Sequence, residues 1–207
     1  MNYELIKVCG MRDAENIREV EALGIDLMGF IFWPKSSRYV SERPAYLPTK
    51  CKRVGVFVDE DIEQVKRIAE EYTLDYIQLH GHESPAYCAQ LQGLKLIKAI
   101  SVGSREDIMT YKSYEGLVDY FLFDTKCPSV GGSGQQFDWT VLADYVGKTP
   151  FLLSGGIGPD DAERLRQAFA SGGFPTRKCA GIDLNSRFEL APGLKDINKL
   201  KSFIESL

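Results

Sequence analysis

The chain alternates between short apolar segments and longer amphipathic segments along its whole length. In the clearest amphipathic segment, Glu60–Tyr72, apolar side chains recur at the spacing of one helical face. Similar patterns predict helices over Asp13–Leu23, Ser84–Gln92, Ser104–Tyr114, Pro159–Ala170 and Lys195–Leu207. The apolar segments, which we interpret as strands, are Glu4–Cys9, Asp26–Phe32, Arg53–Val58, Tyr76–His80, Lys95–Ile100, Tyr120–Asp124, Pro150–Ser154 and Cys179–Leu184. The stretches after the second and sixth strands are weaker and are expected to hold only short helices.

This alternation of strands and helices is typical of a parallel sheet. Eight units predict a closed (β/α)₈ barrel, the TIM-barrel fold, for which about 200 residues is near the lower limit. We therefore expect the 207 residues to form a single barrel domain, residues 1–207, with short connections. An open doubly wound sheet is the alternative. It usually has fewer strands at this length, and no G-x-G-x-x-G motif follows the first strand.

Composition narrows the class of protein. The chain is 44% hydrophobic and 26% charged, which is typical of a soluble globular protein. It has no apolar run of about 18 residues and no signal-like N-terminus, so we expect a cytoplasmic protein without a membrane segment. Five scattered cysteines without a Cys-x-x-Cys pair argue against disulfides and a zinc site. A net charge of −4 does not favour binding to nucleic acid or to an acidic membrane.

Alternate side chains of a barrel strand face the lumen and the surrounding helices. If the helix-facing set is apolar, the polar lumen residues are Lys7, Cys9, Gln78, His80, Lys98, Asp124 and Asp183. Several of them lie at the C-terminal ends of strands, where active sites of this fold are found. This position favours a functional site. The alternative is a polar network whose groups merely satisfy one another.

Two segments have the composition of a phosphate site. Gly155 and Gly156 follow the seventh strand, and Asn185 and Ser186 follow the eighth. Barrels often bind phosphate with these two loops, because glycine lets backbone N–H groups converge on an anion. A plain tight turn is the alternative for the two glycines. A third segment, 131–134, predicts either a glycine-rich lid beside Asp124 or an ordinary flexible loop.

Several motifs resemble one family. The segments KVCGMRD, GFIFWPKSSRYV, RVGVFVDE, IQLHGHE, LFDTKCPSVGGSGQQFDW, LLSGGI and GIDLNSRFE occur in this order between residues 6 and 189. Together they resemble the phosphoribosylanthranilate isomerases of tryptophan biosynthesis. The first and fifth segments are the most specific to that family.

The resemblance implies roles for individual residues. It implies that Cys9 is the general base and Asp124 the general acid. It also implies that Arg38 binds the carboxylate of the anthranilate group. It implies that Gly155 and Gly156, together with Asn185 and Ser186, bind phosphate. It further implies that His80 and Asp183 line the site. Without the resemblance, His80 and Asp124 would be stronger candidates than Cys9 for the acid and base, because imidazole is the usual acid–base group near neutral pH.

One position departs from the family pattern. The family often has a glycine after the polar pair of the eighth strand, where this chain has Arg187. The departure weakens the case for backbone phosphate contacts around Ser186. Arg187 itself is either a charged phosphate contact or a solvated surface residue.

The implied reaction is an Amadori rearrangement of a small phosphorylated substrate. An acid opens the furanose ring, a base removes the proton from sugar carbon 2, and the substrate nitrogen serves as electron sink, so neither metal nor cofactor is expected. Cys9 must be a thiolate to act as base, and Lys7 is positioned to stabilise it. Lys126, two residues after Asp124, complicates the protonation of that acid.

Three other functions fit part of the sequence pattern. An indoleglycerol-phosphate synthase would use glutamate and lysine at strand ends. Lys98 is available for this, but no strand-end glutamate is evident. A ribulose-phosphate epimerase would need a metal site, and the chain has only two histidines. A non-catalytic phosphate-binding barrel is the third alternative. We expect a monomer in preference to a homodimer, because no exposed apolar stripe is evident.

Overall fold

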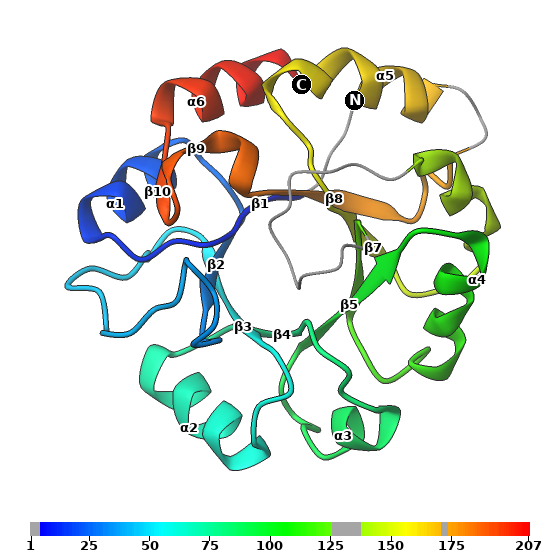
Figure 1. The fold of residues 1–207 in the computed structure, drawn as a ribbon, viewed down its shortest axis with the longest axis horizontal. Coiled ribbons are helices and arrows are strands. Elements are labelled where there is room, and N and C mark those ends of the chain that lie inside the picture. The colour runs from blue at the N-terminus through cyan, green and yellow to red at the C-terminus, as the bar shows by residue number, and fades with distance from the viewer. Residues whose placement is uncertain (1–4, 126–137, 171–173) are drawn as a thin grey trace.

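A closed barrel of eight parallel strands forms the centre of the molecule (Figure 1). The computed structural model describes residues 5–125, 138–170 and 174–207. The strands are β1 (Leu5–Val8), β2 (Leu27–Ile31), β3 (Lys52–Phe57), β4 (Tyr76–Leu79), β5 (Leu96–Val102), β6 (Tyr120–Thr125), β7 (Phe151–Leu153) and β8 (Cys179–Leu184). Each lies at a predicted strand position, so the barrel expected from the sequence is confirmed. The predicted lid at 131–134, Lys126 and Cys127 lie outside the described residues.

Helices surround the barrel on its outer side (Figure 1). They are α1 (Ala14–Ala22), α2 (Ile62–Tyr72), α3 (Pro85–Ala89), α4 (Arg105–Ile108), α5 (Ala162–Ala170) and α6 (Ile197–Ser206). The 3₁₀ turns are η1 (Met109–Ser113), η2 (Trp139–Asp144), η3 (Pro159–Asp161) and η4 (Ser186–Phe188). Each predicted helical segment contains one of these helices. After β2, residues 32–51 form no helix, and the described part of the connection after β6 forms only η2.

Side-chain caps explain where the helices begin. Asp13 and Asp61 each accept hydrogen bonds from two backbone N–H groups in the first turns of α1 and α2. Ser84 caps α3, which has proline at its first position, and Ser104 forms a capping box with Asp107 at α4. Short polar residues before these four helices therefore fix their starts locally.

A small hairpin follows β8 and was not predicted. Its strands are β9 (Glu189–Ala191) and β10 (Leu194–Lys195), which pair antiparallel. Lys195, predicted as the start of the last helix, belongs to β10, and α6 begins two residues later. Strands of two or three residues are too short for hydrophobic period to indicate them.

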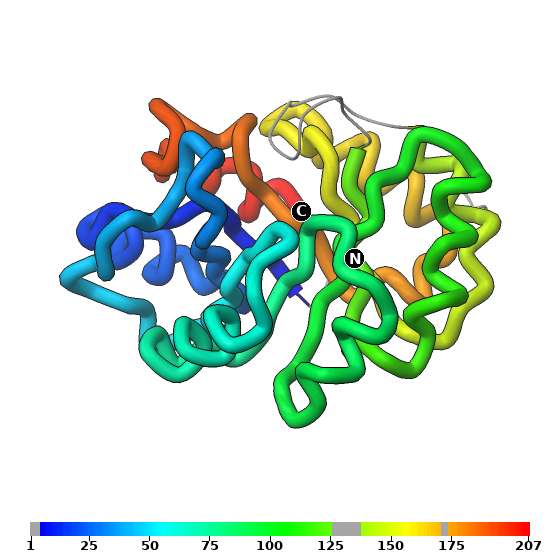
Figure 2. Tube along the Cα trace, turned by 60° about the horizontal axis from the view of Figure 1, so that its bottom comes forward, coloured from blue at the N-terminus to red at the C-terminus, as the bar shows by residue number. Residues whose placement is uncertain are grey.

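The barrel closes where the first strand meets the last. Leu5 to Val8 pair in register with Gly181 to Leu184. At Gly181 a Cβ atom would lie 2.0 Å from the carbonyl oxygen of Leu5, so only glycine permits this approach. Figure 2 shows the consequence for the whole chain: the blue N-terminal elements and the red C-terminal helix lie on the same side of the molecule.

The apolar core has two parts, which fix the orientation of the strands. Inside the barrel, the buried cluster consists of Leu27, Val54, Ile97, Ala99, Leu122 and Leu152. Between barrel and helices, the larger cluster includes Val8, Ile77, Leu79, Phe121, Phe123, Ile182 and Leu184. The inward orientation predicted for Lys7, Cys9, Gln78, His80, Asp124 and Asp183 agrees with this division.

The predicted orientation of β5 is wrong. Ile97 and Ala99 lie in the lumen cluster, so Lys98 points out of the barrel. Its Nζ donates to Glu83 Oε2 at 2.9 Å and to the carbonyl oxygen of Gly81 at 2.8 Å. Both faces of β5 are buried, and the buried carboxylate that neutralises Lys98 comes from the loop after β4. Alternation along the strand could not reveal that partner.

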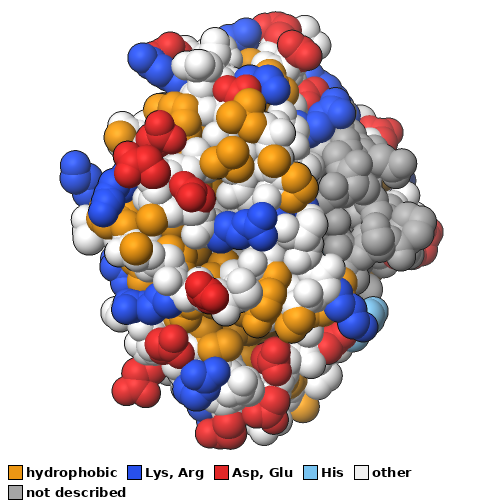
Figure 3. Space-filling view, turned by 60° about the vertical axis from the view of Figure 1, so that its left-hand side comes forward, with side chains coloured by type: hydrophobic (Ala, Val, Ile, Leu, Met, Phe, Trp, Pro, Cys, Tyr) orange, Lys and Arg blue, Asp and Glu red, His pale blue; other side chains and the backbone are white. Residues whose placement is uncertain are grey.

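The surface is mixed in charge. On the face shown in Figure 3, basic and acidic side chains are interspersed with small apolar areas. Among the described residues no helix is both long and apolar enough to cross a membrane.

Candidate functional site

Cys9 lies directly after β1, at the C-terminal end of the barrel. Its backbone N–H donates to the carbonyl oxygen of Leu184 at 2.9 Å, which continues the β1–β8 pairing by one residue. A Cβ on Gly29 of the neighbouring strand would lie 2.6 Å from Cys9 Sγ, so glycine at that position makes room for the sulfur. Cys9 is only 4% exposed. The thiol is therefore held at the barrel mouth by backbone on both sides.

Charged side chains surround the thiol. Lys7 Nζ donates to Asp183 Oδ1 at 2.8 Å, and Ser154 Oγ donates to Asp183 Oδ2 at 3.2 Å. Burial raises the pKa of the Cys9 thiol above its ordinary value. The charge of Lys7 opposes this increase in pKa, that of Asp183 adds to it, and that of Lys195 opposes it. Burial dominates, so the thiol form is favoured in the free protein.

Asp124 lies near the end of β6 and faces His80. The distance between His80 Nε2 and Asp124 Oδ2 is 3.3 Å, and Asp124 Oδ1 accepts from the backbone N–H of Thr125 at 2.8 Å. Gln78 Nε2 lies 2.9 Å from His80 Nδ1, so the amide group holds the far side of the imidazole. The order β6–β7–β8–β1 places Asp124 and Cys9 on strands separated by two others at the same mouth.

Arg38 lies in the connection after β2 and is held by Glu189. Its Nε donates to Glu189 Oε1 at 2.9 Å, and its Nη2 donates to Glu189 Oε2 at 2.7 Å. A Cβ on Gly10, the residue after Cys9, would lie 2.7 Å from Arg38 Cδ. Long-range folding thus brings the arginine beside the turn that carries Cys9.

The glycines after β7 form a turn with left-handed backbone. Gly155 has φ of 90° and Gly156 has φ of 69°, values that L side chains rarely adopt. A Cβ on Gly155 would lie 2.3 Å from Thr125 Oγ1, so the turn also packs tightly against the end of β6. The segment then enters η3 and α5, which gives the glycine-turn-to-helix arrangement expected of an anion site.

The residues after β8 have mixed environments. Asn185 Oδ1 accepts from Lys195 Nζ at 2.8 Å, so this oxygen faces the hairpin. Ser186 begins η4. Arg187 is exposed, and its Nε would lie 3.2 Å from a Cβ on Gly158 in the loop after β7. Arg187 therefore lies against the glycine-containing loop.

The sequence analysis missed Glu189 and Lys195. Lys195 Nζ donates to Glu189 Oε1 at 2.6 Å, and the exposed fractions of the two side chains are 0% and 5%. Burial lowers the pKa of Lys195, and the charge of Glu189 opposes this effect. The motif GIDLNSRFE contains Glu189, but nothing in the sequence indicates a buried partner six residues later.

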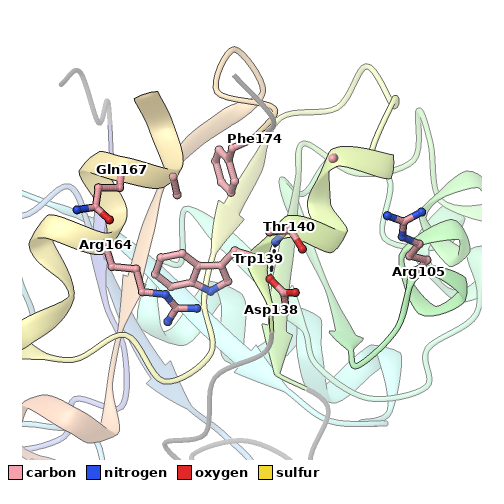
Figure 4. Close-up of a pocket in the computed structure, with 9 residues that line it drawn as sticks. Arg105, Asp138, Trp139, Thr140, Arg164, Gln167 and Phe174 are labelled. Atoms are coloured by element: carbon pink, nitrogen blue, oxygen red, sulfur yellow. Dashed lines mark hydrogen bonds between the residues drawn. The ribbon is translucent and has the colours of Figure 1, made fainter. Parts of the chain in front are cut away.

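A separate pocket lies outside the barrel between η2 and α5 (Figure 4). Its volume is about 560 Å³, and its lining includes Trp139, Arg164 and Phe174. The guanidinium carbon of Arg164 stacks over the Trp139 ring at 3.9 Å from the ring centroid. None of the predicted site residues lines this pocket. Within the described ranges, no group of three or more His, Cys, Asp or Glu side chains could hold a metal ion.

Comparison with known protein families identifies the family of this chain. The family model described as N-(5'phosphoribosyl)anthranilate (PRA) isomerase matches residues 6–206, nearly the whole chain. The chain belongs to this family. A curated relative from Phocaeicola vulgatus, an N-(5'-phosphoribosyl)anthranilate isomerase, is 52% identical over 205 residues, which cover 98% of this chain and 97% of the relative.

Solved structures of phosphoribosylanthranilate isomerases share the fold. The structure from Thermotoga maritima is 32% identical, with a TM-score of 0.81 and coverage of 98% of this chain and 97% of that one. Two others are each 28% identical with a TM-score of 0.76 and the same coverage. One contains monomers generated from the dimeric Thermotoga maritima protein, and the other contains reduced 1-(o-carboxyphenylamino)-1-deoxyribulose 5-phosphate.

Proposed function

We propose that this chain isomerises N-(5'-phosphoribosyl)anthranilate to 1-(2-carboxyphenylamino)-1-deoxyribulose 5-phosphate in tryptophan biosynthesis, without metal or cofactor. The observation that carries the proposal is the placement of Cys9 and Asp124 at the same barrel mouth, one beside Lys7 and one against His80. A base and an acid on separate strands can act on two atoms of one bound sugar. Family membership supports the choice of substrate.

The proposed mechanism uses Asp124 first. Its proton goes to the furanose ring oxygen, the bond from that oxygen to carbon 1 breaks, and the nitrogen lone pair forms an iminium. The Cys9 thiolate then takes the proton from carbon 2, and the electron pair moves through carbon 1 to nitrogen, giving an enolamine. Its tautomerisation gives the ketone. One proton enters and one leaves, so the overall reaction is an isomerisation.

The remaining site residues are proposed to bind substrate. Arg38 binds the anthranilate carboxylate, and His80 and Asp183 line the site beside the acid and the base. Gly155 and Gly156 bind phosphate through backbone N–H groups, with Asn185 and Ser186 beside them. The left-handed turn after β7 supports the phosphate site, because the positive φ angles of Gly155 and Gly156 are typical of backbone turns that bind anions.

We also propose that residues 1–207 act as one catalytic domain, as a monomer in the cytoplasm. The four cysteines in the described ranges are free thiols. Free thiols are typical of proteins in a reducing compartment, which supports this location.

The test is isomerase activity on freshly generated phosphoribosylanthranilate, followed by loss of its fluorescence without added metal. Wild type should turn over, whereas Cys9→Ala and Asp124→Asn should each lose at least about 100-fold in kcat, the usual contribution of a general acid or base. Cys88→Ala is the matched control, because this buried cysteine belongs to α3 and packs in the core between barrel and helices, so its loss should leave kcat unchanged. Wild-type turnover that survives both active-site substitutions would contradict the proposed roles.

A further inference from the structure

A cluster of three largely buried charged side chains lies beside Cys9, and the proposed function gives a role only to its arginine. Glu189 is at its centre, with Arg38 on one side and Lys195 on the other. The Glu189 carboxylate accepts hydrogen bonds from Nε and Nη2 of Arg38 and from Lys195 Nζ. It also accepts one from the backbone N–H of Gly193 at 3.1 Å. Burying three charged groups costs desolvation free energy, which their mutual hydrogen bonds offset only in part. Such a cluster is therefore weak evidence for a purely stabilising role.

The fold fixes this carboxylate rigidly. The β9–β10 hairpin pairs Glu189 with Lys195 across its two strands. Asn16 of α1 then holds Lys195 at both backbone groups: Asn16 Oδ1 accepts from the Lys195 N–H at 2.7 Å, and Asn16 Nδ2 donates to the Lys195 carbonyl at 3.0 Å. The hairpin therefore has a fixed position relative to β1 and its Cys9.

The contact with Glu189 uses only one edge of the Arg38 guanidinium. A guanidinium has five N–H groups, and the contact occupies Nε–H and one N–H of Nη2. Nη1 makes no hydrogen bond to any residue in the described ranges. The edge formed by Nη1 and the second N–H of Nη2 matches the two oxygens of a carboxylate.

We propose that Glu189 is a positioning residue that holds Arg38 with this second edge presented to the aryl carboxylate of the substrate, while Lys195 balances the charge of Glu189. The inference rests on the proposed function, in which Arg38 binds that carboxylate. Two cations around one anion leave one net positive charge for the incoming carboxylate. An arginine held in advance loses less conformational freedom on binding than a mobile one.

The test compares the binding of two stable ligands by calorimetry. One is reduced 1-(o-carboxyphenylamino)-1-deoxyribulose 5-phosphate, and the other is its phenylamino counterpart without the carboxylate. For wild type, the ratio of the two Kd values should be on the order of 100, as expected for a charged hydrogen-bonded pair. The charge-matched variant E189Q/K195M keeps one net positive charge but weakens the grip on Arg38, so this ratio should fall about tenfold. Because both ligands carry the phosphate, any effect of the Lys195 substitution on Asn185 cancels in this ratio.

The outcomes separate this inference from the proposed function. An unchanged ratio in E189Q/K195M, or equal weakening of both ligands, overturns the positioning role. If Arg38→Ala leaves the ratio intact, the proposed role of Arg38 fails as well, as it does if wild type binds neither ligand. If the double variant does not fold, Glu189→Asp is the second variant. It keeps the charge but withdraws the carboxylate by one methylene, and the same ratio must fall.

Discussion

At the scale of single residues, the chemistry of the site depends on how charges are placed around Cys9. Burial favours the thiol, while Lys7 and Lys195 favour the thiolate that a base requires. Because Asp183 binds Lys7, it offsets part of the benefit of that lysine. The pKa of Cys9, the proposed base, therefore results from opposing groups that lie on β1, β8 and β10.

Lys7→Met should shift the pH dependence of catalysis to higher pH. A base acts only when deprotonated, so kcat/KM rises with pH through the pKa of Cys9 in the free enzyme. Removal of the Lys7 charge raises that pKa, because Lys7 is the main group that lowers it. Asp183→Asn should shift the same limb to lower pH, since Asp183 raises the pKa.

The exposed Lys52, which pairs with Asp75, provides the control for this experiment. Lys52→Met should leave the pH–rate profile unchanged. If Lys7→Met and Asp183→Asn shift this rising limb in the same direction, or leave it where it is, electrostatic control of Cys9 by this pair is wrong.

Arg187 gives a second prediction at this scale. It lies against Gly158 in the loop after β7, where the proposed phosphate site is. If its charge contacts phosphate, Arg187→Gln should raise KM about tenfold and leave kcat unchanged, and it should weaken inhibition by inorganic phosphate to a similar degree. Arg166→Gln is the control, because Arg166 lies on the exposed side of α5 and pairs with Glu163. An unaffected KM would make Arg187 a solvated surface residue.

At the scale of elements, both faces of a barrel strand are buried. On β5, the face outside the lumen carries the buried Lys98. Lys98 and Glu83 form an ion pair whose side chains are 4% and 1% exposed. The pair connects β5 to the loop after β4, where Glu83 also accepts from the backbone N–H groups of Asp59 and Gly81. The pair is thus part of the scaffold rather than of the site.

Glu83→Gln should therefore reduce stability without altering catalysis by the folded protein. It leaves the Lys98 charge buried without its anion, which costs about 3–5 kcal/mol in the free energy of unfolding. Denaturant unfolding measures this loss, and the double variant Glu83→Gln/Lys98→Met should recover most of it. A fall in kcat larger than the fall in folded fraction would place the pair in the active site instead.

At the scale of the whole molecule, barrel closure makes the two ends of the chain interdependent. The turn after β1 that carries Cys9, the hairpin after β8 and the final helix lie on the same side of the barrel (Figures 1 and 2). In the described ranges, the large apolar side chains that are most exposed are Val146 and Leu190. Leu190 lies on the β9–β10 hairpin, and Leu194 on the same hairpin is 38% exposed.

We predict that the protein sediments as a monomer at micromolar concentration, because two leucines on one hairpin are too small a patch for a stable dimer. Specific activity should then be independent of protein concentration. The related Thermotoga maritima protein is dimeric, so the opposite result is a definite alternative. If a dimer is found, Leu190→Asp tests whether this hairpin forms its interface.

Much of the fold and of the site could be predicted from local pattern. Strand positions follow from apolar runs, because each strand must bury one or both of its faces. Helix starts follow from Asp13, Asp61, Ser84 and Ser104, because caps act on their own first turn. The inward orientation of Cys9, Asp124 and His80 follows from alternation with apolar neighbours.

Contacts between distant segments were decided only by the tertiary structure. The sequence gives no sign that Lys98 is neutralised by Glu83 outside the barrel, or that Glu189 holds Arg38 from a hairpin 151 residues further along the chain. Charge on a buried side chain is stable only beside a specific partner, and that partner is selected by how the strands close into a barrel. Periodicity determined which face of most strands is apolar, whereas barrel closure determined which charges meet.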